Sequence, residues 1–167
     1  VQIDGEKVEI VGLAPGKAEL LSLVGGVAFS ESFEVVCPTP SAETELLTSS
    51  EKAVVLDPSV VQYRVANTTI LEAGLRMSSC SAIIFEENAA LHVRGGDVEL
   101  YGSSEKPLSL SPLLEGQSYA GIELEGPGEL ALGDLAIDGA SGLDTGAGAS
   151  AALLIKNLGI RDPKQMG

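Results

Sequence analysis

The sequence has little of what nucleic-acid binding, membrane insertion and most catalysis require. Its 167 residues hold no Trp, a single His, and ten Lys and Arg against 24 Asp and Glu, so the net charge is −14. Clustered Lys and Arg supply affinity for nucleic acids and for anionic membranes, so we expect neither as a partner. The longest apolar run, near 151–155, is far shorter than the ~20 residues of a membrane-spanning helix. We therefore expect no membrane span.

Cysteine is equally scarce. Cys37 and Cys80 permit one internal disulfide, and two separate buried thiols fit the sequence equally well, because bridge geometry cannot be read from sequence. There is no Cys-x-x-Cys motif or Cys/His cluster, so a structural zinc site of the usual kind is not expected. The chain begins at Val1 without a signal region, and we expect a processed form or an excised piece of a longer protein.

What the chain does contain is enough apolar material for a core. Apolar residues make up 44% of it, which argues against disorder. Acidic surfaces keep extracellular proteins soluble and attract divalent cations. We therefore expect an ordered protein that is extracellular or exposed at the cell surface.

The recurring element is a short apolar-polar-apolar triplet bounded by Gly, Ser, Asn, Asp or Pro. Each triplet predicts a short strand with two side chains pointing inward and one outward. Met77, Leu100 and Ile122 lie 23 and 22 positions apart, which is a plausible length for one coil of a three-sided solenoid. The triplets in the second half of the chain are Leu75-Arg76-Met77, Leu91-His92-Val93, Val98-Glu99-Leu100, Leu108-Ser109-Leu110, Ile122-Glu123-Leu124, Leu130-Ala131-Leu132, Leu135-Ala136-Ile137 and Leu158-Gly159-Ile160.

These strands are too short for an antiparallel sandwich. A sandwich is usually built from longer strands joined by tight turns such as Asp-Gly, and the chain has only Asp4-Gly5 and Asp138-Gly139. A solenoid winds three short strands per coil and stacks each coil on the last. The pattern therefore predicts an all-β fold, a three-sided parallel β-helix.

Residues 65–142 also resemble the right-handed parallel β-helix repeat proteins of bacterial surfaces and secreted lipoproteins. The resemblance implies a right-handed β-helix and no particular activity, because many functions share such solenoids. The matching segments are Thr68-Thr69-Ile70-Leu71-Glu72-Ala73-Gly74, Ala82-Ile83-Ile84-Phe85, Ala89-Ala90-Leu91-His92-Val93-Arg94-Gly95, Ser104-Glu105-Lys106-Pro107-Leu108-Ser109-Leu110 and Tyr119-Ala120-Gly121-Ile122-Glu123-Leu124.

The chain divides into four predicted parts. Residues 1–36 resemble the second half of a bacterial immunoglobulin-like domain, with Gly25-Gly26 as a hairpin turn, or else form the first solenoid coils. We favour the coils, because half a sandwich leaves a sheet edge and an apolar face uncovered. Residues 37–52 are rich in Pro, Ser and Glu and predict a loop, with one helical turn over 43–47. Residues 53–160 are expected to be the β-helix, and residues 161–167 a polar tail.

The most suggestive binding residues are Asp134, Asp138 and Asp144, which lie in a Gly-rich stretch. Calcium takes six to eight oxygen ligands from carboxylates and loop carbonyls, so these residues are the candidate calcium ligands. The alternative, which we favour, is a solvated loop in which Asp and Gly serve the turn geometry. No other cofactor is expected.

No catalytic residues are identifiable. Alternation points the side chain of His92 outward, and no partner for it can be read from the sequence, so a Ser-His-Asp triad is not expected. Cys80 lacks a basic neighbour that would activate it. Glu99 and Glu123 are close to one coil apart and are expected to stack on one face.

Two functions remain. The first is a non-enzymatic structural or adhesive protein that self-associates, because the open ends of a solenoid must be capped or stacked. The second is a carbohydrate-active or carbohydrate-binding β-helix of the polysaccharide-lyase type, with calcium dependence and a surface polysaccharide as partner. Against it, only three Tyr could act as sugar-binding platforms, and no Asp and Arg pair falls at clear one-coil spacing. The exposed basic positions are Arg76, Arg94, Lys106 and Lys156.

Overall fold

The fold is all-β. A computed structural model describes residues 2–4, 7–9, 15–24, 26–138, 143–145 and 151–161, and the side chains of 15–22 and 26–138. No helix occurs in these residues, and hence none that could cross a membrane. The strands are β1 (Gln2–Asp4), β2 (Lys7–Glu9), β3 (Gly16–Val24), β4 (Val27–Val35), β5 (Ala42–Leu46), β6 (Val54–Val55), β7 (Val60–Val65), β8 (Thr68–Leu71), β9 (Leu75–Ser78), β10 (Ala82–Phe85), β11 (Ala90–Val93), β12 (Val98–Tyr101), β13 (Leu108–Pro112), β14 (Gly121–Leu124), β15 (Gly128–Asp138), β16 (Leu143–Thr145) and β17 (Ala151–Arg161).

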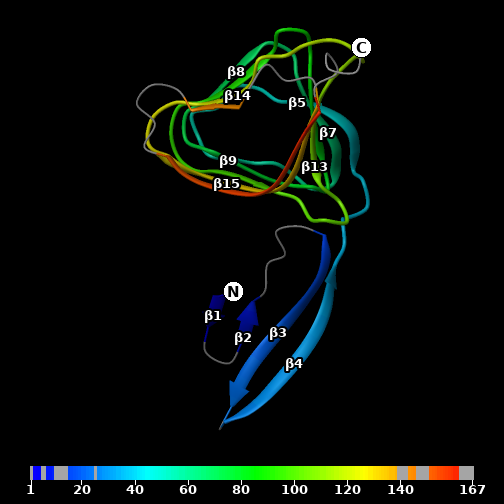
Figure 1. The fold of residues 1–167 in the computed structure, drawn as a ribbon, viewed down its shortest axis with the longest axis vertical. Helices are drawn as coiled ribbons and strands as arrows, with labels where there is room; N and C mark the ends of the chain where they lie inside the picture. The colour runs from blue at the N-terminus through cyan, green and yellow to red at the C-terminus, as the bar shows by residue number, and fades with distance from the viewer. Residues whose placement is uncertain are drawn as a thin grey trace.

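From β5 onward the strands pair in parallel and curl around one core (Figure 1). One ladder runs β5-β7-β10-β13-β15, a second β6-β9-β12-β15, and a third β8-β11-β14-β16. The long strand β15 belongs to the first two ladders and joins them into one sheet, with β17 paired beside it. Asp134, in the middle of β15, has a φ of 45° and marks the bend between the two ladders.

The register confirms one of the two pairings expected from the sequence spacing and corrects the other. Met77 pairs with Leu100, as expected from their spacing of 23 positions. Leu100 pairs next with Leu132, whereas Ile122 pairs with Leu91 in a different ladder. The reason is turn length, because the segments 102–107 and 113–120 are longer than the corresponding turns 79–81 and 86–89.

The core is built from the inward residues of the triplets. Leu91 and Val93 are fully buried while His92 between them is not, and the triplets between residues 75 and 137 follow the same alternation. Phe85 and Tyr119 stack within this core, with ring centroids 4.3 Å apart and planes 7° apart. Burial of each large side chain contributes roughly 1.5–3 kcal/mol, so the core supplies the main driving force for folding.

Glycines let backbone pack on backbone where β8, β11 and β14 turn into β9, β12 and β15. Gly96 has a φ of 75°, and a Cβ there would overlap the carbonyl oxygen of Ala73. A Cβ at Gly74 would lie 2.6 Å from the carbonyl oxygen of Asp97, and one at Gly128 would overlap that of Gly96. Only Gly fits such close approaches, so these turns stack without side chains between them.

The N-terminal part does not continue the parallel ladders. β3 and β4 form an antiparallel hairpin, from Gly16 opposite Val35 to Val24 opposite Val27 (Figure 1). Our favoured interpretation of residues 1–36 as the first coils therefore does not hold for the hairpin, and the resemblance to an immunoglobulin-like domain stays a prediction. Gly26 of the predicted turn has a φ of 81°, and Gly25 lies outside the described residues, as do 10–14.

Residues 37–52 contain a strand where the sequence predicted a loop. β5 adds in parallel to β7, so the helical turn expected over 43–47 is not formed. Hydrogen bonds to the edge of β7 hold this polar segment extended, and tertiary pairing overrides its weak local preference. At the other end of the chain, Arg161 belongs to β17, and 162–167 of the expected tail lie outside the described residues.

Cys37 and Cys80 form a disulfide, with their Cα atoms 5.3 Å apart. The bond joins the segment after the hairpin to the turn between β9 and β10. Nζ of Lys106 lies 3.4 Å from Sγ of Cys37. The hairpin is thus tied covalently to the parallel body of the molecule.

Candidate functional site

The only histidine lies on the outer face of the four-stranded sheet. His92 is the outward residue of β11, and in register it stands between Ile70 of β8 and Glu123 of β14. Its neighbours Leu91 and Val93 are buried, which fixes the direction of the imidazole by simple alternation.

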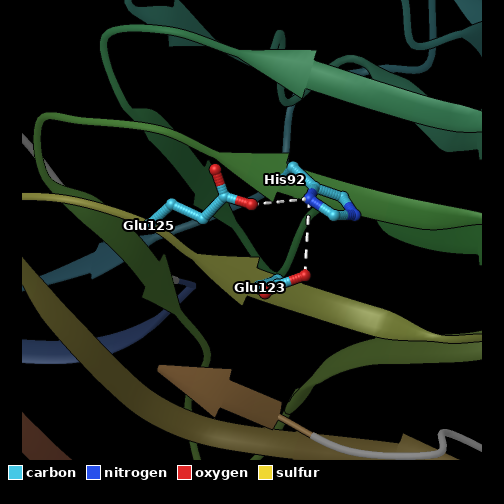
Figure 2. A group of neighbouring side chains, drawn as sticks. All are labelled: His92, Glu123 and Glu125. Carbon is cyan, nitrogen blue, oxygen red and sulfur yellow. Dashed lines mark hydrogen bonds and ion pairs between the residues drawn. The ribbon is translucent and has the colours of Figure 1, made fainter. Parts of the chain in front are cut away.

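Two carboxylates converge on this imidazole (Figure 2). His92 Nδ1 lies 3.1 Å from Oε1 of Glu125 and 3.4 Å from Oε2 of Glu123. The side chain of His92 is 23% exposed, and those of the two glutamates 39% and 38%. Glu123 comes from the centre of β14 and Glu125 directly follows that strand, so one strand supplies both carboxylates.

A further ion-pair chain supports Glu125. Nε of Arg94 lies 3.4 Å from Oε2 of Glu125, and Nη1 of Arg94 lies 3.4 Å from Oε1 of Glu72. Glu125 therefore faces Arg94 with one oxygen and His92 with the other. Arg94 directly follows β11 and Glu72 directly follows β8, so neighbouring strands present these side chains side by side.

Chemically, the cluster offers one imidazole nitrogen and two carboxylate oxygens, all within 4.8 Å of one another. Such a set can hold a proton between its members or bind a metal ion. Two clefts lie at other places in the described residues. One of about 290 Å³ lies over β6, β9 and β12, and another lies against the hairpin of β3 and β4. The cluster lies partly exposed on the outer face of the sheet.

The expected stacking of Glu99 on Glu123 is wrong. Glu99 lies on β12, in register with Arg76 and Ala131, whereas Glu123 lies in another ladder opposite His92. Glu99 forms an ion pair with Arg76, and its hydrogen bond and charge raise the pKa of that guanidinium. The error has the same cause as the misplaced coil step, because both assumed turns of constant length.

The candidate calcium ligands are distributed over two sheets. Asp134 lies at the bend of β15, and Asp138 is exposed at the end of that strand. Asp144 takes the register position next to Glu123 on β16, and its side chain lies outside the described residues. Calcium binding by these three residues stays a prediction.

Two of the three tyrosines are internal and not sugar-binding platforms. The hydroxyl of Tyr63 accepts a hydrogen bond from the backbone N–H of Asp57 at 2.8 Å. Tyr119 is buried against Phe85, and among the described residues its hydroxyl has no hydrogen-bond partner. Burial raises the pKa of Tyr119 well above its ordinary value. Of the expected basic positions, Arg76 and Arg94 are ion-paired, and the side chain of Lys156 lies outside the described residues.

Sequence reasoning placed His92 outward correctly but found no partner for it. The sequence did carry one signal: His92 and Glu123 each occupy the outward, polar position of an apolar-polar-apolar triplet. Because 31 positions separate these two residues, a search at 22 or 23 positions passed over the pair.

No family model, curated protein or solved structure matches the chain. The case for a function therefore rests on its own residues.

Proposed function

We propose that this protein is a non-enzymatic structural or adhesive element of the cell exterior, built as a right-handed, three-sided parallel β-helix that self-associates. In this proposal each coil contributes one strand to each of the three ladders. The parallel pairings, which join residues about one coil apart, support it. So does the run of triplets whose inward side chains form a single core.

The observation that carries the proposal is the open edge of the first coil. Among the described strands, β5 pairs only with β7, and β6 pairs only with β9. An unpaired strand edge is a template on which another strand can add. Leu46 and Val55 on these two strands are 51% and 70% exposed, which gives the edge an apolar character as well.

The backbone of β5 is oriented for such pairing. Leu47 donates its N–H to the carbonyl of Arg64 at 2.9 Å, which turns the odd-numbered positions toward β7. Because hydrogen-bonding groups alternate along a strand, the N–H and C=O of Thr44 and Leu46 point to the open edge. A strand from a second copy could use them without disturbing the existing ladder.

The hairpin provides a second argument for association. Cross-strand neighbours share a face, and one face of the hairpin carries Ala18 opposite Phe33 and Ser22 opposite Phe29. Phe29 and Val27 on that face are 55% and 58% exposed. A two-stranded hairpin is marginal in water without cover, so burial of this face on association is favourable.

The exterior location is supported by the disulfide and by the charge. A disulfide between Cys37 and Cys80 forms and persists in oxidising compartments. The net charge of −14 suits a soluble surface protein. The carbohydrate-active alternative lacks comparable support, because two of the three tyrosines that would bind sugar rings, Tyr63 and Tyr119, are buried.

We expect Thr44→Pro to weaken self-association about tenfold, because losing one edge hydrogen bond while its partner is buried costs roughly 1–3 kcal/mol. Proline removes an N–H that points away from β7, so the first coil should stay in place. Size-exclusion chromatography with light scattering over a wide concentration range measures the change.

Thr44→Val is the matched control, because it alters the same side chain and keeps the N–H. It should associate as the unmodified chain does. A strict monomer at all concentrations of the unmodified chain, or equal behaviour of the two variants, would overturn the edge-pairing proposal.

A further inference from the structure

We propose that His92, Glu123 and Glu125 form a binding site for a first-row transition-metal dication of the zinc class. The site lies on the outer face of β11 and β14 (Figure 2). All three ligands come from one chain, so the inference does not depend on self-association.

The spacing of the ligand atoms fits a small metal ion. Two ligands bound at 2.0–2.1 Å to a tetrahedral zinc lie about 3.3 Å apart. His92 Nδ1 is 3.1 Å from Oε1 of Glu125 and 3.4 Å from Oε2 of Glu123, so both nitrogen-to-oxygen edges already have this length. The third edge, between the two carboxylates, is at most 4.8 Å, and small side-chain rotations of these partly exposed glutamates close the difference.

The charges around the cluster favour a dication. Glu72, Glu123 and Glu125 bring three negative charges, and Arg94 brings one positive charge. With the imidazole neutral, as a metal ligand requires, the cluster has a net charge of −2. Arg94 holds Oε2 of Glu125 at 3.4 Å, which leaves Oε1 facing the imidazole and makes Arg94 a positioning residue.

The types of ligand decide which ion fits. Imidazole with carboxylates suits zinc and its neighbours, and three protein ligands leave one or more positions for water. Calcium takes six to eight oxygens, and an imidazole nitrogen offers it little. The site therefore differs in chemistry from the candidate calcium ligands Asp134, Asp138 and Asp144, although Asp144 is the register neighbour of Glu123.

The single histidine makes the test direct. In a proton NMR titration of the untagged chain with zinc chloride, the imidazole ring resonances can only come from His92. We expect these resonances to shift and to stop shifting at one zinc per chain. Isothermal titration calorimetry under the same conditions gives the stoichiometry and affinity.

Three variants separate a built site from general attraction to an acidic surface. Glu123→Gln and His92→Gln should each weaken zinc binding at least about tenfold. Glu99→Gln, an outward glutamate on a different ladder, is the matched control and should bind as the unmodified chain does. Far-UV circular dichroism checks that each variant keeps its strands, and Glu125→Gln replaces Glu123→Gln if the latter unfolds.

Three results would overturn the inference. The first is an imidazole resonance that does not move at several equivalents of zinc. The second is unchanged affinity in Glu123→Gln or His92→Gln. The third is an equal loss in all variants, including Glu99→Gln, which would mean diffuse attraction to the acidic surface.

Discussion

Replacing Phe85 with alanine is expected to lower the free energy of unfolding by about 3–5 kcal/mol. Phe85 is fully buried and stacks on Tyr119 with ring centroids 4.3 Å apart. The truncation removes apolar contacts, leaves a cavity between the parallel ladders and ends an aromatic pair worth a further ~0.5–1.5 kcal/mol. Urea unfolding followed by circular dichroism measures the loss as a fall in the midpoint concentration.

The neighbouring residue gives the matched control. Ile84 lies on the same strand with its side chain partly exposed on the opposite face. Ile84→Ala removes a smaller apolar side chain, from a partly exposed position on the same strand, and should cost about 1 kcal/mol or less. Equal losses in the two variants would mean that Phe85 does not lie within the core.

Gly96→Ala is expected to destabilise the protein by roughly 2–5 kcal/mol. A left-handed φ costs an alanine about 1–2 kcal/mol, and forcing a methyl group into a filled space adds about 1–3 kcal/mol. Gly96 has a φ of 75°, and its added Cβ would overlap the carbonyl oxygen of Ala73 in the adjacent turn. Since backbone cannot rotate away as a side chain can, the stacked turns must separate. Thermal and urea unfolding measure the effect.

Gly116→Ala separates the cost of the left-handed backbone conformation from the cost of the steric overlap. Gly116 has a similar φ of 82°, but no atom lies within 4 Å of the position that its Cβ would take. This variant should lose only the conformational part, about 1–2 kcal/mol. If Gly96→Ala costs no more than Gly116→Ala, close stacking of these turns does not contribute to stability.

The strands of the body were predictable because their signal is local. In Leu91-His92-Val93 and Val98-Glu99-Leu100, the alternation of buried and outward side chains is complete within three residues. The hairpin was harder to assign. The sequence pattern of Gly16–Val24 and Val27–Val35 is the same whether these strands pair with each other or with the parallel strands of the body. Strand β5 was missed because its composition is that of a loop and only the edge of β7 makes it a strand.

The candidate site could not be read from the sequence because it depends on turn length. His92 and Glu123 pair at a spacing of 31 positions because the turns 102–107 and 113–120 are longer than the corresponding turns 79–81 and 86–89. Turn lengths change the register along the chain while leaving the core unchanged, so they alter which outward residues meet. The direction of His92 was thus predictable, and its partners were not.

The parallel pairings also bear on how the chain reaches this structure. They join residues separated by as few as 18 positions, as in Ala42 and Val60, and by as many as 32, as in Val98 and Leu130. Loop-closure entropy grows only with the logarithm of loop length, so these extremes differ by about 0.5 kcal/mol. No single closure is a dominant entropic barrier. Folding can therefore begin at any group of adjacent strands that buries enough apolar surface. It can then spread to the neighbouring strands, because each added strand closes a loop at nearly the same entropic cost.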